Sequence, residues 1–105
     1  KSEGSESLRK KVLSARKRQE KRYRGTDIRF NSELETKDME KYCYLEKEEA
    51  KMAERLYASL NLSVRSFKKL LVVARTIADL EESDKISTGH LAEAACYRAG
   101  DKLCR

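Results

Sequence analysis

The chain contains no proline and only four glycines in 105 residues, and this scarcity of helix-breaking residues restricts the folds open to it. Helices can run long under such conditions, whereas strand-and-turn architectures need Pro and Gly at their turns and are disfavoured. Hydrophobic residues make up 39% of the chain and charged residues 40%, a balance typical of a soluble, helix-rich domain with a modest core. The sequence therefore predicts one small all-α domain.

Apolar residues recur at helical spacing in several stretches that are separated by turn residues. The segment 63–82 is the most apolar, and its stripe from Val64 to Ala78 is expected to face a core. Residues 24–35 break the helical period, and Ile28, Phe30 and Leu34 are expected to pin this loop onto the body. We therefore predict four or five helices, at residues 7–23, 36–43, 46–60, 63–82 and 88–103.

Residues with capping chemistry lie at the ends of these segments. Ser63 and Ser87 can each accept a hydrogen bond from an orphan amide of the helix that follows, and Thr36 can do the same for the short helix. Asn61 is suited to the left-handed conformation that commonly ends a helix. The capping residues therefore support the predicted boundaries.

Basic charge is concentrated in the first third of the chain. Residues 1–29 contain eleven Lys and Arg against four Asp and Glu, whereas residues 30–105 are nearly balanced. The segment 7–23 is predicted to be a basic helix whose apolar stripe is too narrow for a buried helix. We interpret residues 1–35 as a basic lead-in helix and loop, and residues 36–105 as a compact helical bundle.

This charge asymmetry leaves two interpretations open. A concentrated basic segment can mark an anionic partner such as nucleic acid. It can also be a solvated helix in a protein whose remaining part is acidic. The candidate contact residues, for nucleic acid or for a neighbouring subunit, are Arg16, Lys17, Arg18, Lys21 and Arg22.

Several kinds of chemistry are absent from the sequence. Neither GxxxxGK(S/T) nor GxGxxG occurs, so the chain cannot bind a nucleotide unaided by those routes. With His90 as the single histidine and no CxxC pattern, neither a catalytic Ser/His/Asp set nor a zinc site is indicated. The three cysteines predict free thiols, which are typical of a reducing, cytoplasmic setting. No apolar run is long enough to span a membrane, and the sequence has no signal-peptide pattern. By itself the chain is predicted to be neither an enzyme nor a metal-binding protein.

Arg65 is the charged residue with the clearest functional interpretation. It lies in the first turn of the central helix, where the helix dipole favours negative groups. A cation in that position favours an anion as its partner, and a phosphate is the obvious candidate. On spacing alone, a solvated arginine is the alternative interpretation.

Five other residues are assigned structural roles. Arg75 and Asp79 lie four residues apart on the central helix and can form an ion pair. His90 lies in the first turn of the last helix and is interpreted as a capping or packing histidine. Tyr97 and Arg98, near the end of that helix, are interpreted as residues that lock it against a neighbour.

Three strings occur in a specific order: LSVR at residues 62–65, VARTIADL at residues 73–80 and HLAEA at residues 90–94, followed by Tyr97 and Arg98. This combination resembles the C-terminal domain of the magnesium-chelatase-subunit-I-like AAA+ ATPases, in the ComM-like or YifB-like group. The resemblance covers nearly the whole chain from about residue 8. Further matching positions are Val12, Ala15, Arg16, Gln19, Arg22, Tyr23, Asn31, Leu34, Tyr42, Cys43 and Leu45.

The resemblance implies a helical AAA+ lid domain whose ATPase core, with its Walker motifs, is absent from this chain. It implies that Arg65 is the sensor-2 arginine, which reaches the γ-phosphate of ATP, bound with Mg, in its own subunit or in a neighbouring one. It also implies hexameric rings that act on DNA, with ComM-like members linked to branch migration. Lys68 and Lys69 stand where relatives often carry His-Arg.

Two functions of other classes remain open at this point. A stand-alone basic helical module that binds nucleic acid is supported by the charge of the first 29 residues. An adaptor bundle for a protein partner has no positive feature beyond exposed helix faces. The polar start of the chain is typical of a domain excised from a longer protein, and a Walker A motif upstream in the parent reading frame would favour the lid.

Overall fold

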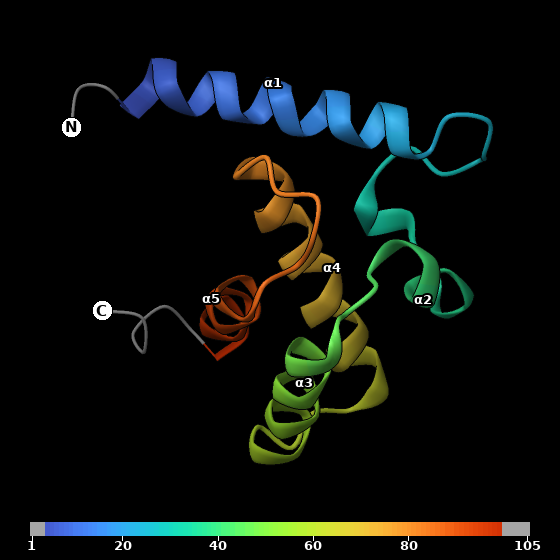
Figure 1. Ribbon diagram of the computed structural model, residues 1–105, viewed down its shortest axis with the longest axis vertical. Helices are drawn as coiled ribbons and strands as arrows, with labels where there is room; N and C mark the ends of the chain where they lie inside the picture. Colours follow the sequence, from blue (N-terminus) through green and yellow to red (C-terminus); the bar gives the residue numbers. More distant parts are fainter. Residues whose placement is uncertain (1–3, 100–105) are drawn as a thin grey trace.

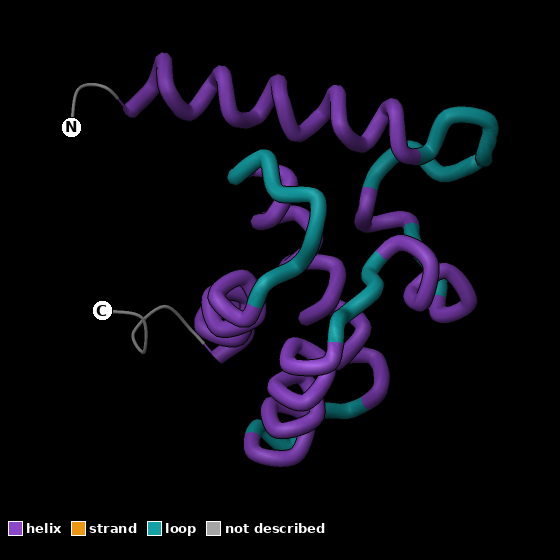
Figure 2. The backbone as a smooth tube through the Cα atoms, in the orientation of Figure 1, coloured by secondary structure: helices purple, strands orange, loops and turns teal. Residues whose placement is uncertain are grey.

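The computed structural model describes residues 4–99, and in this part of the chain the fold is entirely helical, without a β-strand (Figures 1 and 2). The prediction of an all-α bundle with a basic lead-in helix is therefore confirmed. The predicted last turn at residues 100–103 lies outside the described residues. The helices are α1 (Gly4–Arg22), α2 (Met39–Tyr42), α3 (Lys47–Ser59), α4 (Val64–Leu80) and α5 (Thr88–Ala99), with 3-10 turns η1 (Asn31–Glu33) and η2 (Thr36–Asp38).

Most helix ends have the predicted capping geometry. The Ser63 hydroxyl accepts a hydrogen bond from the Ser66 amide at 3.1 Å, and the Ser87 hydroxyl accepts one from the His90 amide at 3.2 Å. Asn61 has a φ of 53°, the left-handed conformation expected after α3. The prediction for Thr36 is wrong, because this residue lies inside η2 and the residue at its N-cap is Glu35.

The core is built around α4, which packs against both α1 and α5, while α3 packs against α5 (Figure 1). The buried residues of α4 lie between Leu70 and Asp79, where the helix packs against its neighbours. The buried cluster also includes Tyr23 and Leu34, so the core extends across the predicted boundary at residue 35. Its other members are Cys43, Ala53, Leu62, Leu70, Leu71, Ala74, Ile77, Ala78, Ile86, Leu91 and Ala94.

Some side chains differ from the sequence expectation. Val64 is 66% exposed, since the first turn of α4 extends beyond the core, and Phe30 is 45% exposed because Leu34 occupies the inward position of that loop. Cys43 is a buried free thiol, whereas Cys96 is disulfide-bonded, so the prediction of free thiols is wrong for Cys96. Among the described helices, none combines the length and apolarity needed to cross a bilayer.

Candidate functional site

Arg65 lies at the exposed start of α4, one residue after the first residue of the helix. The Ser63 side chain caps this end, and the first turn contains no acidic residue. Within residues 4–99, no hydrogen bond or ion pair involves the Arg65 guanidinium. Arg65 is therefore an exposed cation without a hydrogen-bond or ion-pair partner in the described part of the chain.

A groove of about 700 Å³ runs along the face of α4 that carries Arg65. The face follows from helical spacing, because residues three and four apart lie on the same side of a helix. Three cations lie towards one end, and apolar side chains continue towards the other, with no acidic residue in the lining. The lining residues are Ser32, Arg65, Lys68, Lys69, Val72, Val73, Thr76, Ile77, Leu80 and Tyr97. The groove is therefore suited to an anionic group attached to an apolar one.

The other end of α4 carries a fully buried carboxylate, that of Asp79. Arg22 of α1 donates two hydrogen bonds to it, at 2.6 Å and 3.0 Å, in the forked geometry that matches a guanidinium to a carboxylate. Arg75 donates a third at 3.1 Å, one helical turn away, and Asn31 donates a fourth at 3.0 Å. The i,i+4 pair of Arg75 and Asp79 therefore forms part of a larger network that joins α1, η1 and α4.

Asn31 completes this network on the side of α1. Its side-chain oxygen accepts hydrogen bonds from the Tyr23 hydroxyl and from Arg22, and its amide nitrogen also donates to Thr76 at 3.1 Å. The Asn31 backbone N–H donates to the Gln19 side chain at 2.9 Å. Burial raises the pKa of Tyr23 to about 12, which keeps its hydroxyl a donor over the physiological range.

The turn after α4 accepts hydrogen bonds through its main chain. Arg75 donates to the carbonyl oxygens of Ser83 at 2.8 Å and Asp84 at 3.1 Å, and Arg18 donates to the carbonyl of Glu82 at 2.9 Å. Glu82 has a φ of 58°, which turns the chain so that these carbonyls face the two guanidinium groups. Three hydrogen bonds from two arginines therefore hold this turn, and the one from Arg18 ties it to α1.

Burial and partners have opposite effects on the pKa of the buried Arg75 and of the half-buried Arg22. Burial lowers the pKa of Arg75, and its Nε is a buried nitrogen without a hydrogen-bond partner in the described chain. Burial would lower the pKa of Arg22 as well. The hydrogen bonds to Asp79 and the negative charge of Asp79 outweigh this effect, so the pKa of Arg22 is raised. Arg22 is therefore held in its charged form by Asp79.

The structure divides the five candidate contact residues of the basic helix into two groups. Arg18 and Arg22 point to the body of the protein, where Arg18 pairs with Asp84 at 2.9 Å and Arg22 with Asp79. Arg16, Lys17 and Lys21 are exposed and have no ion-pair partner among residues 4–99. Only the second group is available to a partner molecule.

The residues on α5 lie apart from this network. His90 is buried; its Nδ1 accepts the Ser87 amide hydrogen at 2.9 Å and its Nε2 lies 2.9 Å from a carboxylate oxygen of Glu81. The first contact assigns the proton to Nε2, so His90 links the start of α5 to the end of α4 as a neutral ring. Tyr97 is 65% exposed and lines the Arg65 groove. The side chain of Arg98 lies outside the described residues.

Sequence reasoning did not predict the roles of Gln19, Tyr23 and Asn31 in the network around Asp79. A signal was present, because Gln19 and Arg22 continue the stripe of Leu8, Val12 and Ala15 at helical spacing. Polar residues that continue an apolar stripe indicate a buried polar contact. In the described chain, no group of three His, Cys, Asp or Glu residues is placed to hold a metal ion.

Comparison with known proteins identifies the relatives of this chain. The family model described as magnesium chelatase, subunit ChlI C-terminal, matches residues 2–98. The protein YifB of Salmonella typhimurium, described as uncharacterized, is 43% identical over 103 residues, which cover 98% of this chain and 20% of the relative. YifB of Escherichia coli is 42% identical over 101 residues, which cover 96% of this chain and 19% of the relative.

A third relative has a more specific name. The competence protein ComM of Haemophilus influenzae is 40% identical over 101 residues, which cover 96% of this chain and 19% of the relative. The chain thus spans about one fifth of the length of the curated relatives that it matches. No solved structure matches. The chain belongs to the magnesium chelatase subunit ChlI C-terminal family, and within it to the ComM-like and YifB-like group.

Proposed function

We propose that this chain is the lid of a ComM-like AAA+ ATPase and that Arg65 contacts the γ-phosphate of ATP held by a core outside the chain. The observation that carries the proposal is the state of Arg65, which is exposed and has no partner among residues 4–99. The arginines at the opposite end of α4 are all engaged with acceptors of their own domain. An unengaged arginine at a capped helix start is suited to an incoming phosphate.

The chemistry of the Arg65 end fits ATP better than it fits the metal that accompanies ATP. A guanidinium is always charged and matches phosphate oxygens in a fork, and it stabilises the charge that develops during phosphoryl transfer. Lys68 and Lys69 add positive charge in the same groove, which has no carboxylate in its lining. Carboxylates for Mg²⁺ and the phosphate-binding loop would therefore come from the core.

Replacement of Arg65 in the full-length ATPase tests this proposal. Arg65→Ala should reduce ATP turnover by roughly 10²-fold or more, the loss that follows removal of one charge-stabilising donor. Arg65→Lys should retain part of the activity, since it keeps the charge and loses the fork. Arg55→Ala is the matched control, because Arg55 is an exposed arginine on α3 and lies outside the groove.

Both nucleotide affinity and turnover should be measured. Near-normal hydrolysis together with intact nucleotide binding in Arg65→Ala would remove Arg65 from the ATP site. A mixture of inactive Arg65→Ala subunits with subunits defective in the core would show whether Arg65 serves its own nucleotide or that of a neighbour, since only the second arrangement allows the mixture to regain activity.

The assembly and substrate of the full-length protein are part of the same proposal. From the resemblance to ComM-like AAA+ ATPases we propose that the full-length protein forms a ring of subunits, a hexamer, and that the ring acts on DNA. A second candidate function is direct nucleic-acid binding by α1, because exposed cations along this helix have no partner in the described chain: Arg9, Lys10, Lys11, Arg16, Lys17 and Lys21. In that case the isolated chain should be retained by duplex or single-stranded DNA with a steep salt dependence, and no retention at low salt would exclude it.

A further inference from the structure

The stripe by which α1 packs onto the body is covered over only half of its length. In the second half of the helix, Ala15 is 4% exposed and Gln19 is 8% exposed. In the first half, Leu8 and Val12 continue the same stripe at i, i+4 spacing, but they are 58% and 39% exposed. Figure 1 shows why, because the start of α1 extends past the remaining helices. A surface that buries apolar side chains at one end therefore continues uncovered at the other.

Positive charge borders the uncovered half of this stripe. With 3.6 residues per turn, Arg9 lies on one side of the line through Leu8 and Val12 and Lys11 lies on the other, and Arg16 follows on the side of Arg9 one turn after Val12. All three are exposed, and none has an ion-pair partner among residues 4–99. A surface that covers this half should therefore present apolar groups bordered by carboxylates.

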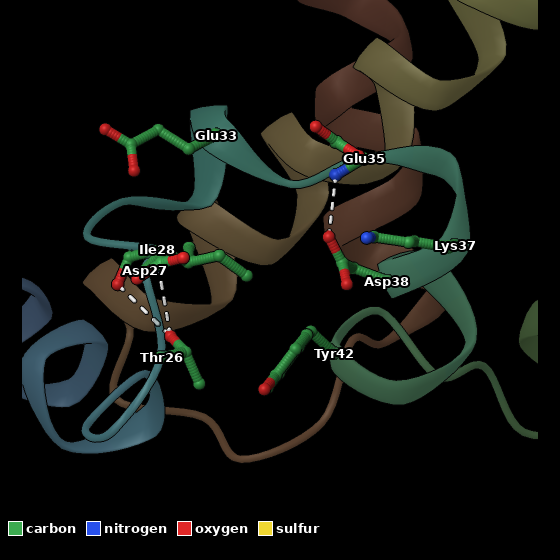
Figure 3. A pocket seen from close by; sticks show the side chains of 8 residues that line it. All are labelled: Thr26, Asp27, Ile28, Glu33, Glu35, Lys37, Asp38 and Tyr42. Carbon is green, nitrogen blue, oxygen red and sulfur yellow. Dashed lines mark hydrogen bonds between the residues drawn. The ribbon is translucent and has the colours of Figure 1, made fainter.

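A cleft with that chemistry lies in the same chain, beyond the other end of α1 (Figure 3). Its volume is about 390 Å³, and Ile28 and Tyr42 supply its apolar contribution. Among its lining residues, Lys37 is the one cation. Arg29 lies beside the cleft, with its Nε 3.7 Å from a carboxylate oxygen of Glu33. Four acidic residues line the cleft, namely Asp27, Glu33, Glu35 and Asp38.

The uncovered first half of α1 cannot reach the acidic cleft of the same molecule. Helix α1 has 19 residues and is therefore about 28 Å long. Its last turn is fixed to α4 by the ion pair of Arg22 with the buried Asp79. The residues that line the cleft follow that fixed end in the chain, from Thr26 to Tyr42, and the uncovered half lies at the other end of α1. A contact between these two surfaces therefore needs two molecules.

We propose that the first half of α1 docks into the acidic cleft of a second copy of this chain. The contact joins two different surfaces, so each copy offers one free α1 and one free cleft, and the arrangement repeats head to tail. Such a contact produces a ring when its rotation closes and a filament when it does not. This contact would build the ring proposed above, and it does not depend on the role proposed for Arg65.

Charge reversal in the full-length protein, without nucleotide, tests the docking. Lys11→Glu with Arg16→Glu should weaken self-association roughly tenfold or more in sedimentation velocity, because like charges then face each other. Asp27→Lys with Glu35→Lys should have the same effect. A protein that carries all four substitutions should regain association, since the complementary charges have exchanged places. The matched control is Lys10→Glu with Lys17→Glu, on the opposite face of the same helix, which should associate normally.

Cross-linking locates the contact directly. When Lys11→Cys and Glu35→Cys proteins are mixed, a bismaleimide should join one to the other, and a mixture of Lys11→Cys with Lys51→Cys, on α3, should give no such product. Far-UV circular dichroism verifies that each variant is folded. Unchanged association in both reversed pairs, or cross-linking no greater than with Lys51→Cys, would overturn the proposal. It would then follow that another surface, such as the remaining polypeptide or a nucleic acid, covers the first half of α1.

Discussion

The two ends of α4 use the same residue type in opposite ways. At the end of the helix, Arg75 is buried and its neighbour Arg22 of α1 is half-buried, and both donate to Asp79. At the start of the helix, Arg65 is exposed and has no acceptor in the described chain. A buried arginine needs acceptors from its own fold, since an unpaired buried charge is strongly destabilising, whereas an exposed one does not. The comparison separates charges that hold α1 onto α4 from a charge that is available to a ligand.

Removal of Asp79 should have the largest effect on stability. Asp79→Ala leaves Arg22 and Arg75 close together without their shared carboxylate, and we expect a loss of roughly 3–5 kcal/mol of unfolding free energy. Urea denaturation followed by circular dichroism measures this loss. Asp84→Ala is the control, since that carboxylate is exposed and its loss should shift the midpoint little. If both variants unfolded alike, the network would not be what holds α1 on the body.

The network around Asp79 should also make the free energy of unfolding depend on pH in the alkaline range. The pKa of Tyr23 is raised from 10.0 to about 12 by burial, so the unfolded chain loses this proton first. Its contribution is therefore complete below pH 10 and is lost as the pH rises through 12. We expect a decrease of roughly 2 kcal/mol from this residue, which Tyr23→Phe should abolish.

A second buried group changes its charge in the same range and serves as a control. Burial raises the pKa of Cys43 from 9.0 to about 11, so its contribution is present below pH 9 and is lost towards pH 11. Unfolding curves of Cys43→Ala between pH 8 and 12 should keep the part of the decrease that comes from Tyr23. An identical pH profile in Tyr23→Phe and the unsubstituted chain would show that the Tyr23 hydroxyl is accessible to water.

The stability of the start of α4 should depend on its N-cap, Ser63, and not on Arg65. Ser63→Ala removes the acceptor of the Ser66 amide hydrogen and should cost about 1 kcal/mol of unfolding free energy. Ser63→Asp keeps an acceptor at the same position and should retain or increase stability. Equal destabilisation by both substitutions would mean that the hydroxyl has another role at this position.

Substitution of Arg65 should have the smallest effect on the free energy of unfolding, and this effect should be an increase. Arg65→Glu places a negative charge in the first turn of α4, and this should raise the unfolding free energy by about 0.3–1 kcal/mol at low salt. The same substitution should abolish ATP turnover in the full-length protein, because a carboxylate repels phosphate. A variant that is more stable but inactive would sharpen the comparison between the two ends, and a destabilised variant would contradict it.

The local features of the fold were predictable from the sequence, and the contacts between distant segments were not. Helical spacing and capping chemistry predict α4, Ser63 and Asn61, because each depends on a few neighbouring residues. The i,i+4 spacing also predicts the pair of Arg75 and Asp79. No local pattern could show that Arg22, 57 residues earlier, donates to Asp79 as well.

In the candidate site as well, local features were predictable and contacts between distant segments were not. The position of Arg65 follows from the helix start and from the family resemblance, both of which are present in the sequence. Its groove could not be predicted, because Ser32 and Tyr97 reach it from η1 and α5 only after the chain has folded. The exposure of Val64 was missed because helical spacing shows which residues share a face and not how far a core extends along it.

The turn after α4 has a consequence for how the sequence can diverge. Arg18 and Arg75 bind its carbonyl oxygens, at Glu82, Ser83 and Asp84, and every amino acid supplies a carbonyl. Side chains in this turn can therefore drift without loss of those three hydrogen bonds, as long as the backbone at Glu82 keeps its positive φ. Glycine and asparagine accept that conformation most readily. Relatives should consequently preserve the shape of this turn and the two arginines more strictly than the identity of the residues that the arginines bind.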